Sequence, residues 1–161
     1  MNLEISIEKT RESDMEQILE LLKLVNLTVE GISKHLDHFY VVKTSGKVVG
    51  CIGLEVYEKI GLLRSLAVHP DYQKAGLGTK LTEKLLVHAK DVGIQDLYLL
   101  TSTAKKFFKR FGFKVITKDN LASIIKRSPG FSYSCETAMR KELDTMITEI
   151  NGYRITEIKI Q

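Results

Sequence analysis

Three features of the chain have the residue types and spacing needed for group-transfer chemistry. A glycine-rich stretch contains Gln73, Gly76 and Gly78, directly before a segment with leucines at helical spacing. Glycines before a helix let the backbone approach an anion, and the free amides of the first helical turn then bind phosphate. Glu55 and Arg64 lie in apolar runs. A carboxylate there can act as a base, and a guanidinium matches a carboxylate in a two-pronged arrangement.

Several other chemistries are excluded or disfavoured by spacing. The glycine stretch lacks the Gly-Lys-Ser/Thr ending of a Walker loop and does not have the three-glycine dinucleotide fingerprint. The four histidines and two cysteines have no metal-ligand spacing, so no metal is expected. Cys51 and Cys135 have no adjacent histidine to activate them, and we expect buried structural thiols. This pattern favours direct transfer without a covalent enzyme intermediate.

Length and composition indicate one enzyme-sized domain. The chain has 161 residues, 43% of them hydrophobic and 27% charged, which is typical of a globular protein. Its net charge of +4 is modest, and the basic residues are scattered without aromatic interleaving. Nucleic acid is therefore not an expected partner. With no signal peptide or long apolar span, we expect a cytoplasmic protein and no membrane contact.

The elements that must position these residues alternate between strands and helices. Period-two patterns predict strands at residues 3–7, 39–42, 47–57, 62–68, 97–101, 112–116 and 133–139. Helical spacing and capping signals predict helices at residues 15–25, 28–38, 77–92, 103–110 and 122–126. Ser13-Asp14 and Thr103 are the expected N-terminal caps, Ser45-Gly46 a hairpin turn and Gly93 a helix terminator. The sequence predicts one mixed α/β domain. Residues 144–161 alternate again, which predicts an added strand or an oligomer contact such as that of a homodimer.

The glycine stretch, together with residues 62–73 before it, resembles the pyrophosphate-binding signature of the GNAT N-acetyltransferases. That signature is Gln/Arg, two residues, Gly, one residue, then Gly or Ala, and Gln73, Gly76 and Gly78 match it. The resemblance implies the α/β (α+β) GNAT fold. In that fold a mixed, mostly antiparallel central sheet is flanked by helices, with acetyl-CoA in a splay between central strands. It covers residues 1–143, which would form the acetyltransferase domain, with residues 144–161 as an extension.

A second stretch, residues 103–113, resembles the family signature beside the pantetheine arm of the cofactor. The family tyrosine that often protonates the leaving thiolate is Phe108 here, which cannot give a proton. Thr101, Ser102 and Tyr133 are weaker stand-ins, and solvent is an alternative. The acetyl-CoA contacts implied by the resemblance are Leu66, Ala67, Val68, Gln73, Lys74, Ala75, Gly76, Leu77, Gly78, Thr79, Phe107 and Phe108. It also implies an oxyanion donor among the backbone amides near residues 66–68.

Five further stretches resemble one subgroup more closely. Residues 28–32, 35–39, 53–57, 62–68 and 99–103 are similar to the arsenic-resistance-linked acetyltransferases of arsinothricin and phosphinothricin. Residues 99–107, Leu-Leu-Thr-x-Thr-x-x-x-Phe, are also like the acetylglutamate synthase branch. Both comparisons imply a small acidic amino acid as acceptor. Its binding residues would be Arg64, Thr101 and Ser102, and its base Glu55.

Each of these roles has an alternative. Glu55 can be an outward-facing strand charge, and Arg64 can form a structural ion pair with it. Lys126 and Arg127 are further candidates for the second acidic group of the acceptor, or simply a solvated helix end. Two other functions stay open. One is acetylation of a polyamine, an aminoglycoside or a protein amine, against which Arg64 argues. The other is a non-catalytic acetyl-CoA-binding module, which Phe108 favours.

Overall fold

The computed structural model describes residues 5–131, 135–143, 148–150 and 153–155. Seven strands form the main sheet in the order β1 (Ile5–Lys9), β2 (Phe39–Thr44), β3 (Lys47–Tyr57), β4 (Ile60–Val68), β5 (Asp96–Thr101), β7 (Thr137–Glu142) and β6 (Lys114–Ile116). All neighbours are antiparallel except β4 and β5. The helices are α1 (Met15–Leu24), α2 (Leu77–Asp91), α3 (Lys105–Lys109) and α4 (Ser123–Lys126), with 3₁₀ turns η1 (Glu12–Asp14), η2 (Ile32–His38), η3 (Pro70–Tyr72) and η4 (Lys118–Asn120). The predicted fold class is confirmed.

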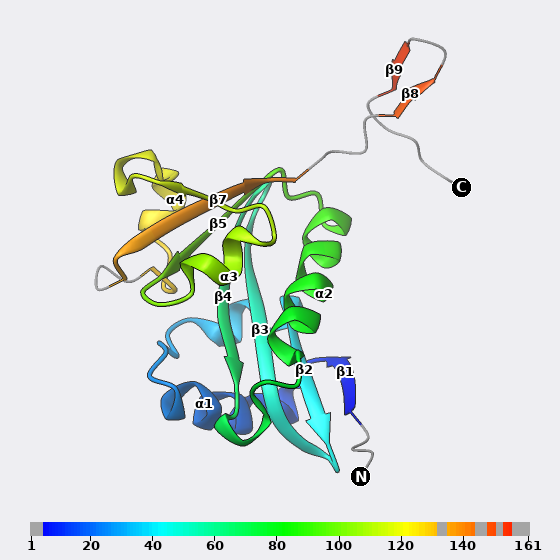
Figure 1. Cartoon of the computed structure of the whole chain (residues 1–161), viewed down its shortest axis with the longest axis vertical. Coiled ribbons are helices and arrows are strands. Elements are labelled where there is room, and N and C mark those ends of the chain that lie inside the picture. The colour runs from blue at the N-terminus through cyan, green and yellow to red at the C-terminus, as the bar shows by residue number, and fades with distance from the viewer. Residues whose placement is uncertain (1–4, 132–134, 144–147, 151–152, 156–161) are drawn as a thin grey trace.

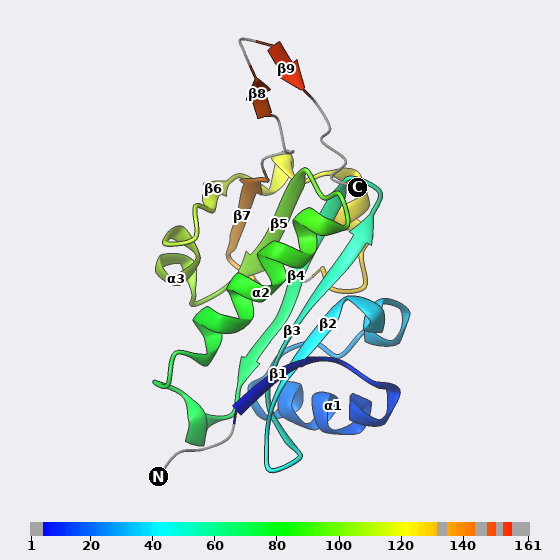
Figure 2. The same cartoon turned by 90° about the vertical axis from the view of Figure 1, so that its right-hand side faces the viewer.

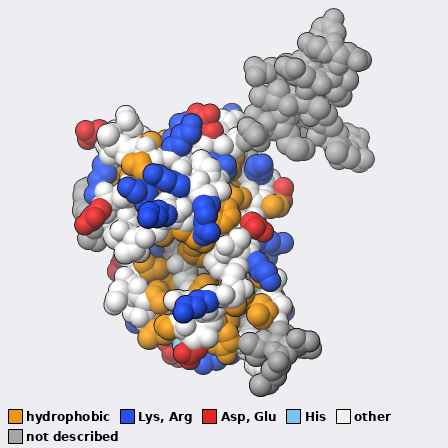
Figure 3. All heavy atoms as spheres, viewed as in Figure 1, with side chains coloured by type: hydrophobic (Ala, Val, Ile, Leu, Met, Phe, Trp, Pro, Cys, Tyr) orange, Lys and Arg blue, Asp and Glu red, His pale blue; other side chains and the backbone are white. Residues whose placement is uncertain are grey.

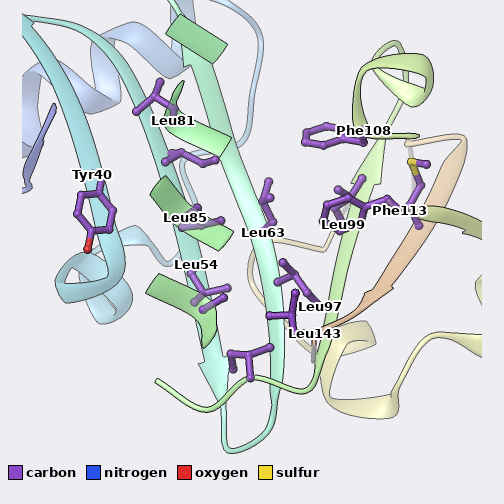
Figure 4. Packing of buried hydrophobic residues seen from close by; sticks show 14 of the residues in the cluster. Tyr40, Leu54, Leu63, Leu81, Leu85, Leu97, Leu99, Phe108, Phe113 and Leu143 are labelled. Carbon is purple, nitrogen blue, oxygen red and sulfur yellow. The ribbon is translucent and has the colours of Figure 1, made fainter. Parts of the chain in front are cut away.

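Helices cover both faces of the sheet. Figures 1 and 2 show α2 on one face and α1 on the other. Figure 4 shows Leu81 and Leu85 of α2 close to Leu54 and Leu63 of the central strands, in one buried cluster. A second cluster joins α1 and η2 to the opposite face of β2 and β3, and a third lies under α4. In the part of the chain that the structure describes, no helix is long and apolar enough to cross a membrane.

The β2–β3 hairpin confirms its predicted turn. Ser45 has φ 49° and Gly46 has φ 75°, so both central residues adopt the left-handed conformation. Two such residues make the turn whose twist matches that of the flanking strands. The long helix α2 also ends as predicted, since Gly93 has φ 88° and donates its amide to the carbonyl of Lys90.

The sheet opens between β4 and β5. These two strands pair only where they begin, at Ile60–Asp96, Gly61–Leu97 and Leu62–Tyr98. Beyond Leu62 the strands diverge, as Figure 1 shows, while β4 continues along β3 to Val68. This divergence is the splay expected between the central strands.

Several predicted boundaries are wrong. Residues 28–31 are not helical, because Gly31 has φ 72° and the 3₁₀ turn begins only at Ile32. The helix predicted from residue 103 begins at Lys105 with Ala104 as N-cap. Thr103 does not cap α3, which has no side-chain cap bond, and Thr101 Oγ1 instead accepts the amide of Ala104, the residue before the helix, at 2.9 Å.

The last strand of the sheet and the C-terminal residues also differ from expectation. The strand predicted at residues 133–139 is β7, which begins at Thr137 and continues to Glu142. Tyr133 lies outside the described residues. In the C-terminal part, β8 (Thr148–Ile150) and β9 (Tyr153–Ile155) pair with each other in a separate two-stranded sheet, and the rest of that part is not described. The domain boundary at residue 143 stays a prediction.

Candidate active site

A cavity of about 400 Å³ lies where β4 and β5 separate. Its walls come from residues 25–28 after α1, residues 62–66 of β4 and residues 99–104 at the end of β5, together with Phe108, Gly130 and Cys135. The surface view shows a hollow with hydrophobic side chains, and Lys and Arg side chains gathered beside it over α3 (Figure 3). The exposed lysines Lys105, Lys106 and Lys109 of α3 belong to this basic region.

A bulge in β4 directs its backbone at this cavity. Ser65 has φ 63°, and the pairing with β3 shifts between Gly53–Arg64 and Cys51–Ala67. Leu66 lines the cavity, and its contact with the cofactor stays a prediction. The side chain of Ala67 packs in the cluster beneath α1, so only its backbone is available to a ligand.

The glycine stretch forms the loop that leads into the first turn of α2. Lys74 and Gly76 have φ 74° and 76°, and α2 begins at Leu77. The amides of the first helical turn have no acceptor within the helix and carry the positive end of its dipole. Leu77 itself is only 1% exposed and belongs to the core, so its amide rather than its side chain faces a ligand. Gln73 ties the loop to β4, because its Nε2 donates to the carbonyl of Val68 at 3.0 Å.

The two phenylalanines of α3 bring the second motif beside the first. A Cβ placed on Gly78 would lie 3.7 Å from Cζ of Phe107, so this ring borders the first turn of α2. Phe108 is 5% exposed, lines the cavity and packs edge-to-face on Phe107. The phenyl ring of Phe108 provides an apolar wall without a donor.

Glu55 and Arg64 form a buried ion pair on the opposite face of the sheet from α2. Glu55 is fully buried, and Arg64 is 6% exposed. Arg64 Nη1 donates to Glu55 Oε2 at 2.9 Å and to the carbonyl of Glu30 at 2.6 Å. Its Nε donates to Ser65 Oγ at 3.1 Å, and its Nη2 to the carbonyl of Thr28 at 3.3 Å. A charge so far from water needs partners of this kind.

The other oxygen of Glu55 receives two hydroxyls. Tyr57 and Ser128 both donate to Oε1, with Ser128 Oγ at 2.5 Å. Burial, and then the bond to Glu55, raise the pKa of Tyr57 to about 12, so that this hydroxyl stays protonated and donates. His35 Nε2 lies 3.8 Å from the same oxygen. Burial lowers the pKa of His35, although the charge of Glu55 opposes this effect.

The predicted acceptor residues divide between the cavity wall and the interior. Arg64, Thr101 and Ser102 line the cavity. Glu55 does not line it, and its role as base stays a prediction. Lys126 and Arg127 are exposed and do not line it either. Sequence reasoning missed Ser128 and Gly130. Their Ser-Pro-Gly run indicates a turn, but gives no hint of a partner 73 positions earlier.

The two cysteines differ in access. Cys51 is completely buried, and burial raises the pKa of its thiol to about 12, which makes it unsuitable as a nucleophile. Cys135 is partly exposed and lines the cavity, so the expectation of a buried structural thiol is wrong for this residue. Within the described residues, no three His, Cys, Asp or Glu side chains form a group that could hold a metal.

The comparisons with known proteins agree with this geometry. Residues 35–115 match the family model of the acetyltransferase (GNAT) domain. The chain therefore belongs to the GNAT acetyltransferases. The match includes β3, β4, the glycine stretch, α2 and α3. The family expected from the two motifs is confirmed.

Three known proteins are similar to this chain in sequence or in fold. An amino-acid acetyltransferase of Escherichia fergusonii is 30% identical over 124 residues, which are 71% of this chain and 28% of the relative. The chain thus spans less than a third of that relative. N-acetylglutamate synthase from Neisseria gonorrhoeae, complexed with coenzyme A and N-acetyl-glutamate, has a TM-score of 0.74 at 22% identity over 89% of this chain and 36% of its own. A Mycobacterium tuberculosis protein in complex with coenzyme A has a TM-score of 0.73 at 25% identity, covering 86% of this chain and 99% of its own.

Proposed function

We propose that the protein transfers the acetyl group of acetyl-CoA to the amino group of a small acidic amino acid, such as glutamate, phosphinothricin or arsinothricin. The observation that carries the acceptor class is Arg64, a buried guanidinium on the wall of the cavity. A cationic acceptor would need carboxylates, and among the described residues that line the cavity there is no Asp or Glu. The curated relative named an amino-acid acetyltransferase supports an amino acid as acceptor.

The donor side rests on the two family motifs. The first turn of α2 offers free amides to the pyrophosphate of acetyl-CoA, and Phe107 borders that turn. The diverging strands leave backbone groups of β4 beyond Leu62 without a partner strand on the cavity side. The thioester would lie along this edge, with a backbone amide near residues 66–68 stabilising the oxyanion. A coenzyme A complex of a related chain supports this cosubstrate.

The reaction is a direct transfer in our proposal. The acceptor ammonium first loses a proton, and its nitrogen attacks the thioester carbon. The C–S bond then breaks, the nitrogen loses its second proton to give the amide, and the leaving thiolate takes up one proton. The burial of Cys51 argues against an acetyl-enzyme at that thiol. With Phe108 at the place of a proton donor, solvent in the open cavity is our candidate for protonating the thiolate.

The test is release of coenzyme A from acetyl-CoA across a panel of amines. The panel contains glutamate, aspartate, phosphinothricin, arsinothricin, spermidine and a lysine-bearing peptide. We expect turnover on acidic amino acids, with a KM for them raised about tenfold or more in Arg64→Lys. Lysine keeps the charge but has three donors instead of five, so it cannot make the four internal bonds of Arg64 and still present a donor to the acceptor. Turnover only on spermidine or the peptide would contradict the acceptor class. Binding of acetyl-CoA without turnover on any amine would favour a non-catalytic module.

A further inference from the structure

The Ser128–Pro129–Gly130 turn closes over the Arg64–Glu55 pair from a distant part of the chain. Ser128 is 7% exposed and donates to Glu55 Oε1. Its hydroxyl hydrogen is committed to Glu55, because the amide of Gly130 already donates to the same Oγ at 2.9 Å. Ser128 therefore has a single fixed hydrogen-bond direction rather than a rotating hydroxyl.

The turn has no room for a side chain where it touches the pair. A Cβ on Gly130 would lie 2.3 Å from Glu55 Oε2 and 3.0 Å from Arg64 Nη1. On its other side the turn packs on the segment before η2, where a Cβ on Gly31 would lie 2.4 Å from Cγ of Pro129. That segment carries the carbonyls of Thr28 and Glu30 that hold Arg64.

These contacts hold Arg64 in one orientation and leave one of its hydrogen-bond donors unused. A guanidinium has five N–H donors. Four are used, by Ser65, Glu55, Glu30 and Thr28, and the fifth, on Nη2, has no partner among the described residues. Arg64 lines the cavity, and this N–H is the one donor of its guanidinium that is not already bonded to a described residue.

We infer that Ser128 is a positioning residue for acceptor binding: it holds the Glu55 carboxylate, and through it the Arg64 guanidinium, in the orientation that meets a carboxylate of the acceptor. The inference rests on the proposed function, since it concerns an acidic acceptor. Without the hydroxyl, Glu55 keeps Tyr57 and Arg64 as partners but loses one of the two donors on Oε1, so its carboxylate holds Arg64 less firmly.

The experiment compares Ser128→Ala, Ser128→Thr and the matched control Ser123→Ala, an exposed serine in the neighbouring helix α4. For Ser128→Ala we expect the KM for glutamate to rise about tenfold, the size of one hydrogen bond to a charged group, with the KM for acetyl-CoA unchanged. Ser128→Thr keeps the hydroxyl and is expected to restore most of the affinity. Ser123→Ala is expected to match the wild type.

Acceptor analogues distinguish a positioning role of Ser128 from a role in stability alone. Glutamine and the α-amide of glutamate each lack one carboxylate, and both are measured as competitive ligands against glutamate, whether or not they are acetylated. We expect Ser128→Ala to weaken binding of only one of them, the analogue that keeps the carboxylate bound by Arg64. Equal weakening of both, or a glutamate KM that does not change, would overturn the inference while leaving the proposed function intact. A wild-type protein that does not acetylate acidic amino acids would overturn both.

Discussion

The carboxylate of Glu55 is surrounded by donors that serve structure as well as chemistry. It receives Arg64 on one oxygen and two hydroxyls on the other, with no exposed surface. Burying an ion pair costs free energy because both charges leave water. Removing only one partner is far more destabilising, since the remaining charge is then buried without a counter-ion. The effect of a substitution at either residue therefore contains a stability part that activity assays alone do not separate.

Glu55→Gln is expected to lower the free energy of unfolding by about 3–5 kcal/mol, because Arg64 keeps its charge and loses its counter-ion. Urea denaturation measures this loss. The double variant Glu55→Gln/Arg64→Met removes both charges, and we expect it to be less destabilised than the sum of the single variants. A single variant as stable as the wild type would contradict the buried pair.

Thiol labelling reports on the cavity directly. Cys135 lines it and is partly exposed, whereas Cys51 is buried with a pKa raised to about 12. We expect iodoacetamide to modify Cys135 alone in the native protein, and acetyl-CoA with glutamate to slow that reaction. Mass spectrometry identifies the site, and Cys135→Ser is the control. Labelling that ligands do not affect would place the ligands elsewhere.

Residue types alone marked part of this site. Glu55 and Arg64 stood out as charged residues inside apolar strands, and the structure shows the ion pair between them that was one of the two alternatives. Ser128 could not be found, because a lone serine in a turn has many bland roles and its partner lies 73 positions away. Cys135 was misjudged because strand-like neighbours suggested burial, yet β7 begins only at Thr137.

At the scale of elements, η2, β2 and α2 meet in a hydrogen-bonded group of three side chains. His38 Nδ1 lies 2.9 Å from His88 Nε2, and Tyr40 Oη lies 3.1 Å from His88 Nδ1. Lys9 and Lys84 approach the ring of Tyr40 from β1 and α2. Burial, and then the charge of Lys9, lower the pKa of both histidines. The contact of α2 with the sheet edge thus depends on neutral imidazoles.

This group predicts a dependence of stability on pH. With folded-state pKa values below the unfolded value of 6.5, the unfolded chain binds more protons at mildly acidic pH. The contribution of these histidines to the free energy of unfolding should be fully present above about pH 6.5. It should decrease as the pH is lowered below that value. Urea midpoints at pH 7.5 and 5.5 measure the difference.

His88→Gln is expected to reduce this pH dependence, leaving the parts due to His38 and His35, whose pKa values are also lowered by burial. His69→Gln, in the loop before η3, serves as the control and should keep the full dependence. An unchanged profile in His88→Gln would mean that the group does not govern acid stability.

Elements with strong local signals were predicted well, and those set by tertiary contacts were not. The β2–β3 hairpin and α2 carry their own turn residues and periodicity, so their bounds were nearly right. Thr103 looked like a helix cap, but α3 has no side-chain cap bond, and it is Thr101, at the end of β5, that accepts the amide of Ala104 just before the helix. Local sequence does not determine which of two neighbouring hydroxyls reaches an amide.

At the scale of the molecule, the main sheet consists of two parts that are joined between β4 and β5 by three residue pairs. The proposed acetyl-CoA site lies between these parts, from the first turn of α2 to the cavity. A ligand that bridges them binds the folded chain and not the unfolded one. It should therefore stabilise the whole molecule.

Acetyl-CoA at about 100 times its Kd should add roughly 2.7 kcal/mol to the free energy of unfolding. At about 2–4 °C per kcal/mol for a chain of this size, the Tm should rise by roughly 5–10 °C. Gly78→Asp puts a negative charge at the helix start where the pyrophosphate is expected, and it should abolish the shift. Gly78→Ala is the matched control, because its Cβ makes only ordinary contact with Phe107 at 3.7 Å. An equal shift in both variants would place the cofactor elsewhere.

The open edge of β4 also bears on which acetyl donors the protein would accept. A strand edge with free amides and carbonyls binds an extended chain that carries amides of its own. The pantetheine arm has two amide groups, so it would occupy the place that β5 leaves empty. We then expect S-acetylpantetheine, which lacks the nucleotide, to remain a slow donor, whereas a short acetyl thioester without amides should not react. The gap in the sheet would thus make the protein selective for the carrier arm of the donor. That selectivity would come from pairing between the amides of the arm and the backbone of β4, rather than from recognition of the acetyl group.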